Sequence, residues 1–171
     1  MKKTRKITIA FNQYQLPVLI TIASERQACK TAASNQRYCE SSDFSIGLQG
    51  VMGEAAVAAE LGLKVDRKPS ITGDDKITDL QFGDTRIQVK CRKPHTKFLY
   101  FNTLEKFAAE IGVATSLSGA SEVDIIGWIT RQEFRDKHIL KDFGYGQRVA
   151  VPDADLQPPD TLLAHLKQLN P

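Results

Sequence analysis

The chain has 171 residues, of which 42% are hydrophobic and 25% are charged, a composition typical of one folded domain with its own core. Its net charge of +3 permits an anionic partner without requiring one, and the absence of an apolar run of about 18 residues argues against a membrane span. Three cysteines without a C-x-x-C pair and three scattered histidines give little support to a zinc site or a disulfide framework. A reduced, cytoplasmic compartment is expected.

The N-terminal segment places basic residues before an apolar stretch, as an export signal does. Asn12, Gln13 and Gln15 interrupt that stretch before it reaches the length of a signal's apolar core. The sequence therefore predicts a strand over "KITIAF" (6–11) followed by a helix. Arg26, one of several basic residues before residue 40, is interpreted as part of a solvated helix face rather than a binding surface.

The remaining elements are predicted in chain order from periodicity, composition and capping signals. They are a helix then a loop over 19–40, a helix over Phe44–Leu63, a polar linker over 64–75, a hairpin within 76–92, a helix over "NTLEKFAAEIG" (102–112) with Asn102 and Glu105 as its cap, a loop over "TSLSGAS" (115–121), a buried strand over "VDIIGWIT" (123–130), a short helix opened by a Thr130–Glu133 capping box, a strand over "QRVAVP" (147–152) and a closing helix over 159–169. This order predicts an α/β domain, a mixed sheet flanked by helices.

The hairpin has a definite predicted register. Gly83-Asp84 is a reasonable two-residue turn, which pairs Leu80 with Ile87 and Asp79 with Gln88. Side chains alternate across a strand, so the hairpin has an apolar face with Leu80, Phe82, Ile87 and Val89, and a polar face with Asp79, Gln88 and Lys90.

The polar face has two interpretations. A carboxylate opposite an amide oxygen can bind a hard cation such as Mg²⁺, and Lys90 two residues beyond Gln88 could contact a phosphate. That grouping suits metal-assisted phosphodiester hydrolysis. The alternative is a cross-strand polar pair on a solvated face, which is common in antiparallel sheets.

Glu54 favours the functional interpretation. It is the single acid on the stripe of the 44–63 helix that should face the sheet, since its helical neighbours are small or apolar. A buried carboxylate is usually paired or bound to metal, because leaving it unpaired costs several kcal/mol. The alternative is an ion pair at the edge of the stripe with an arginine such as Arg92. The small neighbours would also let the helix approach the hairpin closely.

The series "GVMGEAAVAAELGL" (50–63), Asp79 and "QVK" (88–90) resembles the PD-(D/E)xK nuclease superfamily, in a phage or bacterial member. In that family a helix supplies a glutamate, one strand an aspartate, and the next strand an acid or glutamine followed two residues later by lysine. The resemblance covers 44–130 and implies a restriction-endonuclease-like core of helix, three strands, helix and strand. In a single domain of 1–171, residues 1–43 would be an N-terminal extension, and 131–171 a C-terminal strand and helix.

The resemblance also implies a site. Asp79 and Gln88 would bind Mg²⁺, or Mn²⁺ as a substitute, together with the Val89 carbonyl. Glu54 would be a ligand or support the ligands, and Lys90 would be the catalytic lysine. Gln88 is neutral where many members carry glutamate, which favours one metal or a weakened pair. Asp75, in the preceding loop, is an alternative to Asp79.

Basic and aromatic residues follow the motif. Arg92, Lys93 and Lys97 are expected to contact nucleic-acid phosphates. The interleaved Phe98, Tyr100 and Phe101 either stack on bases or belong to the core, and Trp128 is expected in the core.

The resemblance thus implies a DNA-cleaving enzyme of recombination, repair or restriction in a bacterial or phage-infected cell, and allows a homodimer. One alternative is the same fold with a lapsed active site that binds nucleic acid or a protein. Another is a tRNA-directed or junction-resolving nuclease.

Overall fold

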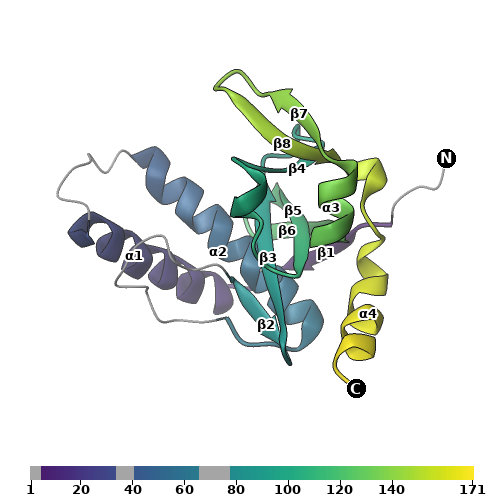
Figure 1. Ribbon diagram of the computed structural model, residues 1–171. Coiled ribbons are helices and arrows are strands. Elements are labelled where there is room, and N and C mark those ends of the chain that lie inside the picture. The colour runs from purple at the N-terminus through teal and green to yellow at the C-terminus, as the bar shows by residue number, and fades with distance from the viewer. Residues whose placement is uncertain (1–4, 34–40, 66–77) are drawn as a thin grey trace.

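The computed structural model describes residues 5–33, 41–65 and 78–171. These residues form a mixed α/β fold with four α-helices and two sheets (Figure 1). The helices are α1 (Gln15–Ala33), α2 (Ser41–Leu61), α3 (Arg131–Lys137) and α4 (Leu162–Leu169). The strands are β1 (Ile7–Ala10), β2 (Leu80–Phe82), β3 (Thr85–Arg92), β4 (Phe98–Phe101), β5 (Ile111–Gly119), β6 (Glu122–Thr130), β7 (Ile139–Asp142) and β8 (Gln147–Pro152).

The larger sheet has the strand order β1-β6-β5-β3-β2, and only the β3–β5 pair is parallel. The smaller, antiparallel sheet has the order β4-β8-β7. Figure 1 shows α2 against the larger sheet and α1 alongside α2, with the β7–β8 hairpin projecting at one end of the molecule. Within the described residues, no helix combines the length and apolar character needed to cross a membrane.

The predicted hairpin register is confirmed. Leu80 pairs with Ile87 across β2 and β3, and the turn begins at Gly83, whose φ of +56° suits glycine. The C-terminus fixes this turn, because the Asp84 main-chain N–H donates to Asn170 Oδ1 at 2.8 Å. The asparagine amide in turn donates to Thr85 Oγ1 at 3.0 Å.

Two hydrophobic cores lie on opposite faces of the larger sheet. The first joins α1, α2 and α4 to one face and includes Ile87, Val89 and Val113. The second, under the smaller sheet and α3, includes Ala114 and Ile129. Val113 and Ala114 are adjacent in β5 and enter different cores, as the alternation of side chains along a strand requires.

Helix α2 is the predicted helix at 44–63, and it lies very close to the sheet. Residues 51–58 are all buried, because α1 covers one side of α2 and the sheet covers another. A Cβ at Gly53 would lie 2.7 Å from both Cys91 Cβ and Thr115 Oγ1, so only glycine allows this approach. The close helix–hairpin approach expected from the small residues is confirmed.

The predicted helix at 102–112 is wrong. Only Leu104–Lys106 is helical, as a 3₁₀ turn whose N-cap is Thr103, and β5 begins at Ile111. The expected Asn102 cap is therefore wrong as well. Tertiary packing overrides the local pattern: Phe107 is buried and stacks on Phe101 at 4.8 Å between centroids. The loop predicted at 115–121 is also wrong in its first part, since β5 continues to Gly119 and pairs with β6.

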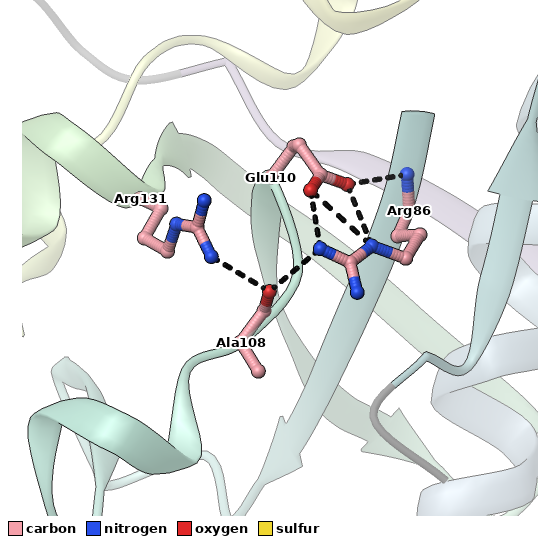
Figure 2. Close-up of polar contacts among 4 residues, drawn as sticks. All are labelled: Arg86, Ala108, Glu110 and Arg131. Atoms are coloured by element: carbon pink, nitrogen blue, oxygen red, sulfur yellow. Dashed lines mark hydrogen bonds and ion pairs between the residues drawn. The ribbon is translucent and has the colours of Figure 1, made fainter. Parts of the chain in front are cut away.

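An arginine–glutamate cluster fixes the start of β5 (Figure 2). Glu110 accepts from the main-chain N–H of Arg86 at 2.9 Å and from its guanidinium Nε at 3.0 Å. Arg86 and Arg131 both donate to the Ala108 carbonyl, at 3.2 and 3.0 Å. These bonds with Arg86 lower the pKa of Glu110 to about 2. They hold β3, the start of β5 and the start of α3 together.

The C-terminal predictions are confirmed in outline. The Thr130–Glu133 capping box has both of its bonds and opens α3, and β8 matches the predicted strand at 147–152. The closing helix starts at Leu162, after a 3₁₀ turn. Trp128 is buried as expected, and its indole N–H lies 3.0 Å from Pro158 O.

Candidate active site

Asp79 lies at the open end of the hairpin, immediately before β2 begins, where β3 extends beyond β2 and keeps only β5 as a neighbour. Its main-chain N–H donates to Ile87 O at 3.0 Å, which extends the hairpin by one bond. Its side-chain Oδ2 accepts from the Val89 main-chain N–H at 2.7 Å. The N–H and C=O of one strand residue point to the same side of the strand. The Val89 carbonyl therefore lies on the same edge of β3 as the Asp79 carboxylate.

Glu54 approaches this edge from α2 and is only 8% exposed. Its carboxylate forms a two-bond ion pair with Arg26 of α1, with both N–O distances at 2.9 Å. The sequence alternative of an ion pair is thus observed, with Arg26 in place of Arg92. The interpretation of Arg26 as part of a solvated face is wrong, because this pair holds its guanidinium between the two helices.

The surroundings of Asp79 shift the pKa of its carboxyl group. The pKa of Asp79 is raised from 3.8 to about 6, mainly by burial and next by the negative charge of Glu54. The Val89 hydrogen bond and the charges of Lys90 and Arg26 oppose this rise in pKa. Glu54 and Lys90 therefore both lie within electrostatic reach of Asp79, although they are 36 residues apart in the chain. Both charges therefore act on Asp79, although α2 packs on the face of β3 that carries Val89 and Lys90 lies on the opposite face.

Gln88 and Lys90 leave β3 on the face opposite Val89. Gln88 is buried, and its amide Nε2 donates to Lys106 O at 3.1 Å, while its Oε1 has no hydrogen-bond partner among the described residues. Lys90 is exposed, and its Nζ lies 5.3 Å from the centroid of the Phe101 ring. Asp79 reaches the edge between the two faces rather than only the Gln88 side. From this position the charges of both Glu54 and Lys90 influence the pKa of Asp79.

The basic residues after the motif separate into two groups. Arg92 is 5% exposed and its Nη2 lies 2.6 Å from Asp153 Oδ2, so it is turned into the protein instead of toward a phosphate in solvent. Lys93 and Lys97 are exposed, as a phosphate contact would need. The aromatics divide in the same way: Phe101 belongs to the second core, whereas its neighbours Phe98 and Tyr100 are only partly buried.

The donor set at the edge of β3 is rich in oxygen but low in charge. It comprises the carboxylates of Asp79 and Glu54 and the Val89 carbonyl, with the unpartnered Gln88 oxygen on the adjoining face. Within 5–33, 41–65 and 78–171, no three His, Cys, Asp or Glu side chains form a group able to hold a metal. Asp75 lies outside the described residues. Mg²⁺ often takes only one or two protein carboxylates and keeps several waters, so this set fits Mg²⁺ better than a metal that needs a complete protein cage.

Sequence reasoning missed two partners of the site, Arg26 and Asp153. A partial signal existed for the first, because an acid within an apolar stripe requires a cation. Which arginine supplies it depends on how α1 packs against α2, and the sequence pattern does not encode that packing. Asp153 follows β8, which pairs with β4 in the smaller sheet, whereas Arg92 belongs to β3 of the larger sheet. Its approach to Arg92 is a property of the tertiary fold.

Comparisons with protein-family models, with curated proteins and with solved structures find no match for this chain. The chemistry of the site is therefore inferred from its own residues. A carboxylate with a raised pKa, a second buried carboxylate and a nearby ammonium can hold a cation and stabilise negative charge on a bound group.

Proposed function

We propose that the protein is a Mg²⁺-dependent nuclease of the PD-(D/E)xK type, which hydrolyses phosphodiester bonds in DNA. The observation that carries this proposal is the position of Asp79, held against the Val89 N–H within electrostatic reach of Glu54 and Lys90. The order of α2, the β2–β3 hairpin and the parallel strand β5 supports a restriction-endonuclease-like core. The 3₁₀ turn in place of a second core helix departs from that core.

Asp79 and the Val89 carbonyl would hold the metal, since both lie on the free edge of β3. Mg²⁺, when bound there, supplies a Lewis acid that polarises a phosphate oxygen and lowers the pKa of bound water. Both oxygens of Glu54 are already paired with Arg26, so Glu54 would add negative charge near the metal without binding it through both oxygens. Asp79 must lose its proton to bind the metal, so its raised pKa links metal binding to pH.

Lys90 would act on the DNA. Its ammonium is exposed beside Asp79, where it can approach a phosphate and stabilise the negative charge that develops during hydrolysis. The Nζ itself lies 5.3 Å from the centroid of the Phe101 ring, and this cation–π contact limits the positions that Nζ can take. The exposed Lys93 and Lys97 would contact the DNA backbone outside the reacting phosphate.

A second candidate function is a binding module with the same fold and a lapsed active site. It is favoured by neutral Gln88 at the position of an acidic ligand and by the Arg26 cation on Glu54. Both features reduce the negative charge available to a metal. The binding module and the nuclease differ in whether DNA is cut at all.

The deciding experiment incubates supercoiled plasmid and linear DNA with the protein in EDTA, in Mg²⁺ and in Mn²⁺. The nuclease proposal expects nicks or shortened products in both metals and intact DNA in EDTA. Intact DNA under all conditions, with retained binding, would favour the binding module.

A further inference from the structure

The outer face of the smaller sheet carries four aromatic side chains in contact with one another. Phe98 and Tyr100 come from β4, and Phe143 and Tyr145 come from the loop between β7 and β8. Phe143 lies 5.9 Å from Phe98, 4.7 Å from Tyr100 and 6.2 Å from Tyr145, measured between ring centroids. The hydroxyls of Tyr100 and Tyr145 are 3.3 Å apart. The second core takes its aromatic residues from other positions, so these four rings are not needed to fill it.

Two cations lie over these rings. Lys141 Nζ is 4.7 Å from the centroid of Phe98 and 5.9 Å from that of Phe143. The Arg148 guanidinium carbon is 5.3 Å from the centroid of Tyr145. Both residues lie on the hairpin that projects in Figure 1, Lys141 on β7 and Arg148 on β8. The aromatic-cationic face is defined here as Phe98, Tyr100, Phe143, Tyr145, Lys141 and Arg148.

The loop presents Tyr145 to solvent in a fixed conformation. Gly144 and Gly146, on either side of it, have φ values of +92° and +104°, which glycine adopts at little cost. The Asp142 carboxylate closes the loop by accepting from both glycine N–H groups, at 2.7 and 3.3 Å. Tyr145 is 60% exposed as a result. The Asp142 carboxylate, next to Lys141 in the chain, is thus occupied with the loop's own backbone.

The smaller sheet also adjoins the candidate active site. Phe101, next to Tyr100 in β4, contacts Lys90, and Arg92 of β3 pairs with Asp153 immediately after β8. The charge of Arg92 also acts on Tyr100. The end of β3 that carries Lys90 thus meets the inner side of β4, where Phe101 is buried, and the aromatic-cationic face lies on the outer side of the same strand.

We propose that the aromatic-cationic face binds single-stranded DNA. The inference deepens the proposed nuclease function and rests on it for the choice of DNA as the ligand. Exposed aromatic rings with interleaved cations stack on unpaired bases and neutralise phosphates. In a duplex the bases are stacked on one another, so these rings would find no free base face. The substrate class expected is DNA with a single-stranded segment.

The test measures fluorescence anisotropy of a labelled oligothymidylate of about 15 nucleotides and of a duplex of equal length, both in Ca²⁺. Tyr145→Ala should weaken binding of the single strand about fivefold or more, as expected for loss of a stacking side chain, and leave duplex binding within about twofold. Tyr145→Phe should restore single-strand binding. Tyr14→Ala is the matched control, because Tyr14 is 77% exposed at the start of α1 and lies outside the aromatic-cationic face.

Equal single-strand affinity in Tyr145→Ala and the parent would overturn the inference, as would equal losses for single strand and duplex, or no binding of the single strand by the parent. The anisotropy measurement and the cleavage assay test different proposals. A parent that never cuts DNA but binds single strands through Tyr145 contradicts only the proposed nuclease function. A parent that cuts DNA and shows no Tyr145 dependence contradicts only the inference about this face.

Discussion

The Asp79 carboxylate accepts a 2.7 Å hydrogen bond from the Val89 main-chain N–H, one residue before Lys90. This bond fixes an acid at the edge of β3, just before the first residue of β2. Burial and Glu54 together raise the pKa of that acid to about 6. A charged side chain is thus held in a place that disfavours its charge, which is a common arrangement at functional sites.

Asp79→Asn should stabilise the metal-free protein near pH 7. The folded protein holds the Asp79 proton more tightly than the unfolded chain does. The free energy of unfolding of the parent protein therefore falls as pH rises from about 4 to about 6. Asparagine keeps the acceptor for Val89 and removes the buried charge. We expect a higher free energy of unfolding in EDTA near pH 7, by up to roughly 3 kcal/mol, and no gain near pH 4.

Thermal or urea unfolding at the two pH values measures this difference. Asp84→Asn, in the exposed turn of the same hairpin, is the control and should change stability by less than about 0.5 kcal/mol. A less stable Asp79→Asn protein near pH 7 would show that the charge of Asp79 is favourable in the fold.

Gln88→Glu should tighten binding of Mn²⁺. A carboxylate adds one negative charge at the same reach, worth on the order of 1 kcal/mol or more near a cation, so we expect about a tenfold gain in affinity. Isothermal titration calorimetry on both proteins measures the change. Gln81→Glu, exposed on β2, controls for the overall charge. Equal or weaker Mn²⁺ binding by Gln88→Glu would mean that this position does not contact metal.

Lys90→Ala should lower the cleavage rate by about a hundredfold or more, the scale of a lost electrostatic catalyst. An interaction made only in the transition state affects turnover and not binding, so DNA affinity in Ca²⁺ should change only a few-fold. Lys93→Ala is the comparison. Loss of one exposed phosphate contact should reduce the slope of log affinity against log salt concentration by about one and leave turnover nearly unchanged. A Lys90→Ala protein that cuts normally but binds weakly would assign Lys90 to ground-state binding.

Glu110→Gln should destabilise the fold at neutral pH. The hydrogen bonds from Arg86 lower the pKa of Glu110 to about 2 from 4.5, so their contribution is present above about pH 4.5 and is lost as pH falls toward 2. Thermal unfolding should show a lower midpoint for the variant near pH 7 and a shrinking difference in acid. Glu122→Gln, at the exposed start of β6, should leave the midpoint unchanged. Equal midpoints for Glu110→Gln and the parent near pH 7 would show that the cluster in Figure 2 adds nothing to stability.

Local patterns predicted the parts of the fold that local physics determines. Alternation fixed the pairing of Leu80 with Ile87, because a slip of one residue would expose the apolar face. The capping box at Thr130 and the helix that carries Glu54 were predictable for the same reason, since caps and helical composition act within a few residues.

Long-range contacts account for the errors. The 102–112 segment has a helical composition, yet Phe107 is drawn into the second core and Glu110 toward Arg86, which commits the following residues to β5. Arg26 and Arg92 were both given solvent-facing roles because the sequence does not show which acid each will meet. Burial of Arg92 against Asp153 and of Arg26 against Glu54 depends on segments distant in the chain.

The most direct measurement of the central claim is the initial rate of plasmid nicking in Mg²⁺ by the parent protein and by Asp79→Ala, with circular dichroism to verify that the variant is folded. The proposed nuclease predicts metal-dependent nicking by the parent and a rate indistinguishable from the EDTA blank for the variant, because Asp79 would hold the metal. Undiminished nicking by a folded Asp79→Ala protein would contradict the assignment of the site to the edge of β3.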